Sequence, residues 1–102
     1  GQVRIIDYKT GTVQQRDLEI IDWKPLATDY KFSKAFQVLT YALMMQGEEP
    51  IENAEAGIIS FKNMNSGFMK FAAKESARGQ KNTQITQEVL QLFTEQLTQL
   101  IL

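Results

Sequence analysis

The feature that most constrains this chain is a run of β-branched and aromatic residues at positions 3–8, VRIIDY, which ends at the turn signal Thr10-Gly11. Such a run predicts a β-strand. Successive side chains of a strand point to opposite faces, and apolar residues occur on both faces of this one. We therefore expect the strand to be covered on both sides, with Tyr8 turned into the core. Other segments must provide that cover.

The next segments alternate between helical and strand-like patterns. Residues 12–31 predict an irregular connection with one short strand near residues 18–21. From Ser33, a possible N-cap, apolar residues fill most sides of a helix that Gly47 and Pro50 are expected to end. This distribution predicts a helix packed inside the domain, with the Phe32-Phe36 and Met44-Met45 pairs in its core.

The second half of the chain predicts two strands and a closing helix. Residues 56–61 and 67–71 are strand-like and flank the turn formers of residues 63–66, so they predict a hairpin. Beyond Thr86, a possible cap, apolar residues recur at helical spacing. The expected fold class is α/β, with a mixed sheet and flanking helices in one unit.

Composition limits the chemistry. The chain has 102 residues, of which 43% are hydrophobic and 23% charged, as expected for one globular domain. It contains neither cysteine nor histidine, which excludes disulfides, thiolate sites and histidine general bases. Any bound metal should therefore have oxygen ligands. The absence of cysteine is compatible with a cytoplasmic location, and no apolar run approaches the roughly 18 residues of a membrane span.

The formal net charge of -1 argues weakly against a stand-alone DNA-binding domain. It does not exclude a nuclease, because metal-binding carboxylates lower the charge that bound cations restore. Five basic residues of the second half are read as a solvated rim, with a DNA groove as the alternative: Lys62, Lys70, Lys74, Arg78 and Lys81.

The strongest chemical candidates are Asp7 and Lys9. Side chains two apart on a strand share a face, so a carboxylate and an ammonium are expected side by side at the strand end. This pair suits hydrolysis of a phosphodiester, in which a carboxylate binds Mg²⁺ and a lysine serves the attacking water. The simpler alternative is a surface ion pair worth about 0 to 1 kcal/mol. A similar pair, Asp22 and Lys24, precedes Pro25 and is assigned to a loop or edge.

Two strings together resemble a known family. Residues 5–11, IIDYKTG, are similar to the D-Y-K segment of RecB-like and AddB-like nucleases of the PD-(D/E)XK superfamily. Gln37 and Tyr41 are similar to the Q-x-x-x-Y motif that follows it in those families, and as i, i+4 neighbours they share one helical face. The alternative for these two residues is a polar seam on a core helix.

The resemblance implies a restriction-endonuclease-like fold whose central strand carries Asp7 and Lys9. It also implies Mg²⁺-dependent (or Mn²⁺-dependent) hydrolysis of DNA, as in exonucleases of DNA repair. Asp7 would be a metal ligand together with the backbone carbonyl of Tyr8, Lys9 would serve the attacking water, and Gln37 and Tyr41 would position the substrate. DNA and a helicase subunit or domain would be the partners.

The resemblance also implies a missing part. The family places another metal-binding aspartate on a strand before the D-Y-K strand, and nothing precedes Gly1 here. We therefore expect residues 1–102 to be the C-terminal portion of such a domain, inactive alone and able to form a homodimer through the open part of its sheet. The alternative function is a non-catalytic, nuclease-like scaffold domain within a larger helicase-nuclease.

Overall fold

A three-stranded sheet forms the centre of the structure, a computed structural model that describes residues 3–26, 28–48, 54–74 and 79–101. Its spatial order is β1 (Val3–Lys9), β3 (Ala54–Ser60) and β4 (Met69–Lys70). β1 runs parallel to β3, and β4 runs antiparallel to it. Because β3 lies in the middle of the sheet, six of its seven residues are buried.

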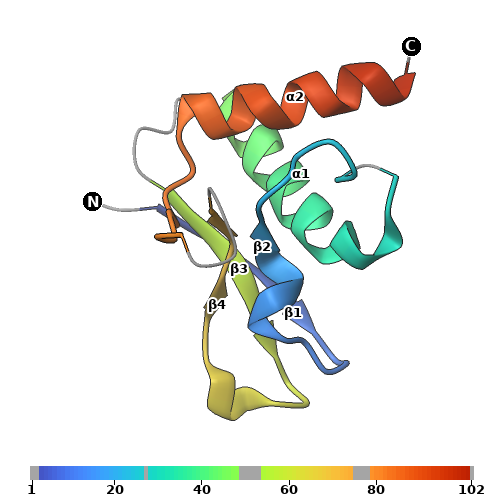
Figure 1. The fold of residues 1–102 in the computed structure, drawn as a ribbon. Helices are drawn as coiled ribbons and strands as arrows, with labels where there is room; N and C mark the ends of the chain where they lie inside the picture. The colour runs from blue at the N-terminus through green and yellow to red at the C-terminus, as the bar shows by residue number, and fades with distance from the viewer. Residues whose placement is uncertain (1–2, 27, 49–53, 75–78, 102) are drawn as a thin grey trace.

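Two long helices pack on one side of this sheet, and several short elements connect the strands and helices (Figure 1). The parallel pair of β2 and β5 makes a second, smaller sheet. The bounds of these elements are η1 (Gln15–Leu18), β2 (Glu19–Ile20), η2 (Tyr30–Phe32), α1 (Ser33–Glu48), η3 (Met64–Ser66), β5 (Ala72–Ala73) and α2 (Gln87–Ile101). This architecture confirms the expected mixed α/β fold. No helix in the described ranges is both long and apolar enough to cross a membrane.

The core lies between α1, α2 and one face of the sheet. The buried residues of α1 follow an i, i+3, i+4, i+7 pattern, which places them in one stripe against β1 and β3: Ala35, Val38, Leu39 and Ala42. Phe36 of α1 meets the ring of Phe93 of α2 edge-on, with the centroids 5.4 Å apart. Thr86 caps α2 as predicted, since its Oγ1 accepts a hydrogen bond from the Val89 N–H at 3.2 Å.

Close packing at the sheet explains Gly57 of β3. A Cβ atom there would collide with the backbone of β4 at the carbonyl of Met69. The turn that joins these strands contains Gly67, whose φ of 62° is in the region that favours glycine. The expected hairpin is therefore present, with Gly57 permitting the approach and Gly67 the turn.

Among the described residues β1 pairs only with β3, so it stands at the edge of the sheet, and the open edge expected at this strand is present. The expectation that both faces of β1 are covered was wrong. Its second face is open, with Ile6 37% and Tyr8 56% exposed. Tyr8 does not enter the core and instead stacks on Phe61, with the ring centroids 5.7 Å apart. Apolar residues on both faces did not mean cover on both faces.

The expectations for α1 also need correction. Ser33 is the first residue of the helix rather than its N-cap, because the η2 turn leads directly into α1. Gly47 lies within α1, and Pro50 lies outside the described residues. Met44 and Met45 were predicted to be core residues, but they are 66% and 41% exposed. Phe32 and Phe36, also predicted to be core residues, are partly buried against the core.

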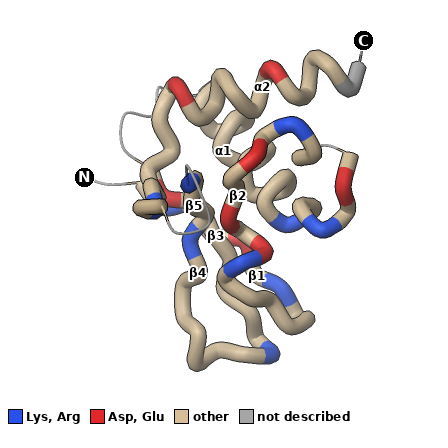
Figure 2. The backbone as a smooth tube through the Cα atoms, in the orientation of Figure 1, with Lys and Arg blue, Asp and Glu red and all other residues tan. Residues whose placement is uncertain are grey.

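Charged residues of both signs are interspersed along the backbone (Figure 2). Three members of the predicted basic rim are paired with glutamates: Lys70 with Glu55 at 2.7 Å, and Lys74 and Lys81 with Glu19 at 3.0 and 2.7 Å. Arg78 lies outside the described residues. The rim is therefore not a row of free cations, which weakens the DNA groove considered for it.

Glu55 is the most enclosed of these acids, with 6% of its side chain exposed. The hydrogen bond from Lys70 lowers the pKa of Glu55, and this effect outweighs burial, which acts in the opposite direction. Thr83 adds a weaker hydrogen bond of 3.3 Å. Glu55 is thus a charged structural anchor on the face of β3 opposite α1.

Candidate active site

The carboxyl end of β1 brings Asp7 and Lys9 together. Their side chains share the face of β1 that carries the buried Ile5, and Lys9 Nζ lies 3.1 Å from Asp7 Oδ2. This contact is an ion pair, and apart from it the buried Oδ2 accepts no hydrogen bond among the described residues. Only 14% of the Asp7 side chain is exposed, against 30% of Lys9. A buried carboxylate oxygen is thus left with spare bonding capacity.

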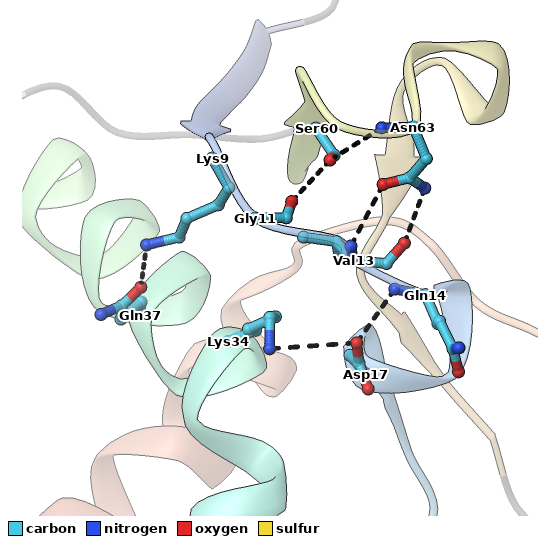
Figure 3. Close-up of polar contacts among 9 residues, drawn as sticks. All are labelled: Lys9, Gly11, Val13, Gln14, Asp17, Lys34, Gln37, Ser60 and Asn63. Atoms are coloured by element: carbon cyan, nitrogen blue, oxygen red, sulfur yellow. Dashed lines mark hydrogen bonds and ion pairs between the residues drawn. The ribbon is translucent and has the colours of Figure 1, made fainter.

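Helix α1 contributes Gln37 to this pair. Lys9 Nζ donates a hydrogen bond of 2.6 Å to Gln37 Oε1, across 28 residues of sequence (Figure 3). The residues come from the end of β1 and the second turn of α1, which pack against each other. An ammonium has three donors, so the contact with Gln37 fixes the direction of Lys9 while leaving further donor capacity. Asp7, Lys9 and Gln37 therefore form one polar cluster.

Tyr41 follows Gln37 by one helical turn but is not part of the same hydrogen-bond network. It is 44% exposed and lines a shallow pocket of about 250 Å³ with Ile5, Met44 and Met45. No hydrogen bond of its hydroxyl occurs among the described residues. The alternative, a polar seam on a core helix, would need a backbone hydrogen bond from Tyr41, and the described residues contain none. Tyr41 instead presents an aromatic ring and a free phenol beside the cluster.

The donor set can be tested for its fit to a divalent cation. The N–H of Phe61 donates to the carbonyl of Lys9 at 2.9 Å, so the backbone groups of Lys9 face β3. Backbone groups alternate along a strand, and the Tyr8 carbonyl consequently points to the open edge of β1. The spare oxygen of Asp7 and this carbonyl suit a hard cation in type. They are too few by themselves, since the described residues hold no group of three or more acidic side chains.

The turn that follows β1 is anchored from β3 and the segment after it (Figure 3). Ser60 Oγ donates a 2.6 Å hydrogen bond to the carbonyl of Gly11. The Asn63 side chain accepts from the Val13 N–H at 3.2 Å and donates to the Val13 carbonyl at 2.8 Å. Ser60 is fully buried. These two residues hold the turn beside Lys9, and the sequence did not reveal them.

A second lysine stands near the cluster. Lys34 lies one turn before Gln37 on α1, and its Nζ is 4.0 Å from Asp17 Oδ2 of η1. The same Asp17 oxygen accepts the Gln14 N–H at 2.9 Å. Lys34 is 35% exposed on its side chain. No motif in the sequence identified Lys34 or Asp17.

The second aspartate-lysine pair is placed apart from the cluster. Asp22 Oδ1 accepts a hydrogen bond from the Lys24 N–H at 3.1 Å, within a turn that has no strand geometry. Both side chains are exposed. This confirms that Asp22 and Lys24 lie in a loop. Trp23 between them packs at a tilt on Phe71, with 6.1 Å between the ring centroids.

Comparison with known proteins gives one family. The model of the PD-(D/E)XK nuclease superfamily matches residues 1–101. No curated protein and no solved structure matched the chain. The mixed sheet with flanking helices is consistent with the restriction-endonuclease-like fold of that superfamily. On this match across nearly its whole length, the chain belongs to the PD-(D/E)XK nuclease superfamily.

Proposed function

We propose that this chain contributes the Asp7–Lys9 half of an active site that hydrolyses DNA phosphodiesters. The observation that carries the proposal is the convergence of Asp7, Lys9 and Gln37 from β1 and α1, with 3.1 Å and 2.6 Å between their polar atoms. Superfamily membership supports phosphodiester hydrolysis as the reaction. The similarity of residues 5–11 and of the Gln37–Tyr41 pair to RecB-like nucleases favours DNA as the substrate and DNA repair as the role.

Mg²⁺ (or Mn²⁺) is the proposed cofactor, held by Asp7 and the Tyr8 carbonyl together with ligands from outside the described residues. When bound, such a cation supplies positive charge against the phosphate oxygens and makes a water easier to deprotonate. Asp7 offers the oxygen that has no hydrogen-bond donor, on a strand that holds it still. Apart from its ion pair with Lys9, this buried oxygen has no hydrogen-bond donor among the described residues, and the proposed role would use it.

Lys9 and two residues of α1 are assigned to handling the attacking water and the substrate. Gln37 keeps the Lys9 ammonium at the end of β1, where its remaining donors can orient the attacking water or contact the phosphate. Tyr41 lies one turn further along α1, and we assign its ring and hydroxyl to the positioning of the DNA strand. Holding these groups before the substrate arrives lowers the entropy that the reaction must give up.

A nuclease-like scaffold domain is the second candidate function. It is favoured by the small ligand set, because the described residues alone hold no group of three acidic side chains. In that case the open edge of β1 would bind a helicase subunit or domain, or a second copy of the chain. We propose the enzyme first, since a scaffold would have no need for the convergence of Asp7, Lys9 and Gln37 at one end of β1.

A cleavage assay with the full-length protein tests the choice. The enzyme predicts that labelled DNA is degraded when Mg²⁺ is present and remains intact in EDTA. Degradation that continues in EDTA would contradict the proposed cofactor. DNA that remains intact in Mg²⁺ and in Mn²⁺, with a protein that is folded by circular dichroism, would favour the scaffold.

A further inference from the structure

Gly11, in the anchored turn after β1, has no internal reason to be a glycine. Among the described residues the only positive φ belongs to Gly67, so Gly11 has a backbone conformation open to any residue. A Cβ atom added at Gly11 would meet nothing within 4 Å, and the residue is exposed. The same holds for Gly47 on α1, so the missing side chain alone does not mark a site. What Gly11 does provide is bare backbone that another molecule can approach closely.

The backbone of Gly11 also has an open donor. Its carbonyl accepts from Ser60 Oγ at 2.6 Å, but its N–H donates none of the hydrogen bonds found in the described part of the chain. Ser60 and Asn63 hold the turn in place from both ends. Because this N–H belongs to an exposed residue in an anchored turn and has no partner in the described part of the chain, it can donate to an anion without first breaking an internal bond.

Two lysines lie near this turn, Lys9 within the candidate cluster and Lys34 on α1. Lys9 precedes the turn by two residues, and Lys34 lies one helical turn from the residue that Lys9 contacts, Gln37. The only acid within 4.0 Å of Lys34 in the described ranges is Asp17, at the limit of ion pairing. Figure 3 shows Lys34 directed from α1 toward η1 and Lys9 directed from β1 toward α1. Two lysines on neighbouring elements suit a ligand that carries more than one negative charge.

We propose that Gly11 and Lys34 form a subsite for the phosphate backbone of the DNA strand that is cut. The N–H of Gly11 donates to a phosphate oxygen beside the scissile bond, and the Lys34 ammonium contacts a neighbouring phosphate. Asp17 keeps Lys34 extended until the strand arrives. The subsite rests on the proposed function, because it orients the strand relative to Asp7 and Lys9. It adds two residues that act in binding and not in the chemical step.

The first test is Gly11→Ala in the full-length protein, with Asp7→Asn in every variant so that the DNA remains whole. Binding of a fluorescein-labelled single-stranded oligonucleotide is measured by anisotropy. We expect Gly11→Ala to weaken binding about tenfold, as when one hydrogen bond to an anion is lost. The melting temperature should not fall, because the added Cβ meets no atom of the chain. Gly47→Ala is the matched control, since a Cβ there also meets nothing within 4 Å.

The second test is the salt dependence of Lys34→Gln in the same background. Losing one phosphate contact should reduce the slope of log affinity against log salt by about 0.7 for a single strand. Lys24→Gln removes the same charge from an exposed loop and should leave the slope unchanged. Equal slopes for the Lys34 and Lys24 variants would overturn the assignment of Lys34.

The outcomes separate the subsite from the function on which it rests. If the Asp7→Asn protein binds DNA and Gly11→Ala binds it equally well, the subsite is wrong and the proposed active site stands. If the Asp7→Asn protein does not bind DNA and the wild-type protein does not cleave it, the proposed function fails as well. Weaker binding by Gly11→Ala, with Gly47→Ala unaffected, supports the subsite.

Discussion

The amide oxygen of Gln37 on α1 lies 2.6 Å from the ammonium of Lys9 at the end of β1. This contact joins two segments whose motifs are 28 residues apart, and it makes the helix part of the candidate site. Lys9 is thereby held on the side of β1 where Asp7 Oδ2 is buried and without a hydrogen-bond donor. The arrangement leads to predictions for each of these residues.

Asp7→Asn should abolish Mg²⁺-dependent cleavage by the full-length protein, because an amide replaces the anionic ligand without changing the shape of the side chain. The fold should be retained, since Asp7 accepts no structural hydrogen bond at Oδ2. Cleavage of labelled DNA and the melting temperature are the two measurements. A variant that cleaves at the wild-type rate would rule out Asp7 as a metal ligand.

Substitutions on α1 should separate function from stability. Gln37→Ala and Tyr41→Phe should reduce cleavage with little loss of stability, because both side chains are exposed. Leu39→Ala removes a fully buried side chain and should lower the free energy of unfolding by about 2 to 5 kcal/mol. Urea unfolding is measured beside cleavage. If Tyr41→Phe loses as much stability as Leu39→Ala and cleaves normally, Tyr41 is structural.

Glu55 should make stability depend on acid pH. Its pKa in the folded protein is lowered by the hydrogen bond from Lys70, so its stabilising effect is complete above the ordinary glutamate pKa of about 4.3. The effect is lost as the pH falls through the lower, folded-state pKa. The wild-type melting temperature should therefore fall more steeply in acid than that of Glu55→Gln. Parallel curves for the two proteins would contradict this role.

The open edge of β1 should make the 102-residue chain self-associate. In the described part of the chain, that edge has no strand partner, and Val3, Ile6 and Tyr8 are exposed on β1. Two-fold pairing of such edges is a common remedy. Sedimentation velocity should show a concentration-dependent dimer, which Ile6→Lys should weaken by placing a charge on the strand. A monomer at every concentration would contradict the prediction.

The elements with strong local patterns could be predicted from the sequence. The stripe from Ala35 to Ala42 and the cap at Thr86 are set by neighbours three or four residues away, so the sequence contains the necessary information. The exposure of Tyr8 and Met44 could not be predicted in the same way. Whether an apolar face is covered depends on which distant segments reach it, and no local period records that.

The site shows the same division. Asp7 and Lys9 share a strand face by their spacing alone, which is why the pair could be proposed before the structure. The anchoring by Ser60 and Asn63 is different, because their partners are 49 and 50 residues away. Serine and asparagine in a turn-like segment are common for local reasons. Only the parallel pairing of β1 with β3 brings them to the turn.

The amide of Asn63 ties the early part of the chain to a part that is made much later. During synthesis, residues 11–13 leave the ribosome well before Ser60 and Asn63 do, and they lack these two anchors until then. Contacts between residues so far apart form slowly, because a long loop must close first. In the growing chain, the turn next to Asp7 and Lys9 is therefore not yet fixed. It becomes fixed only when β1 pairs with β3.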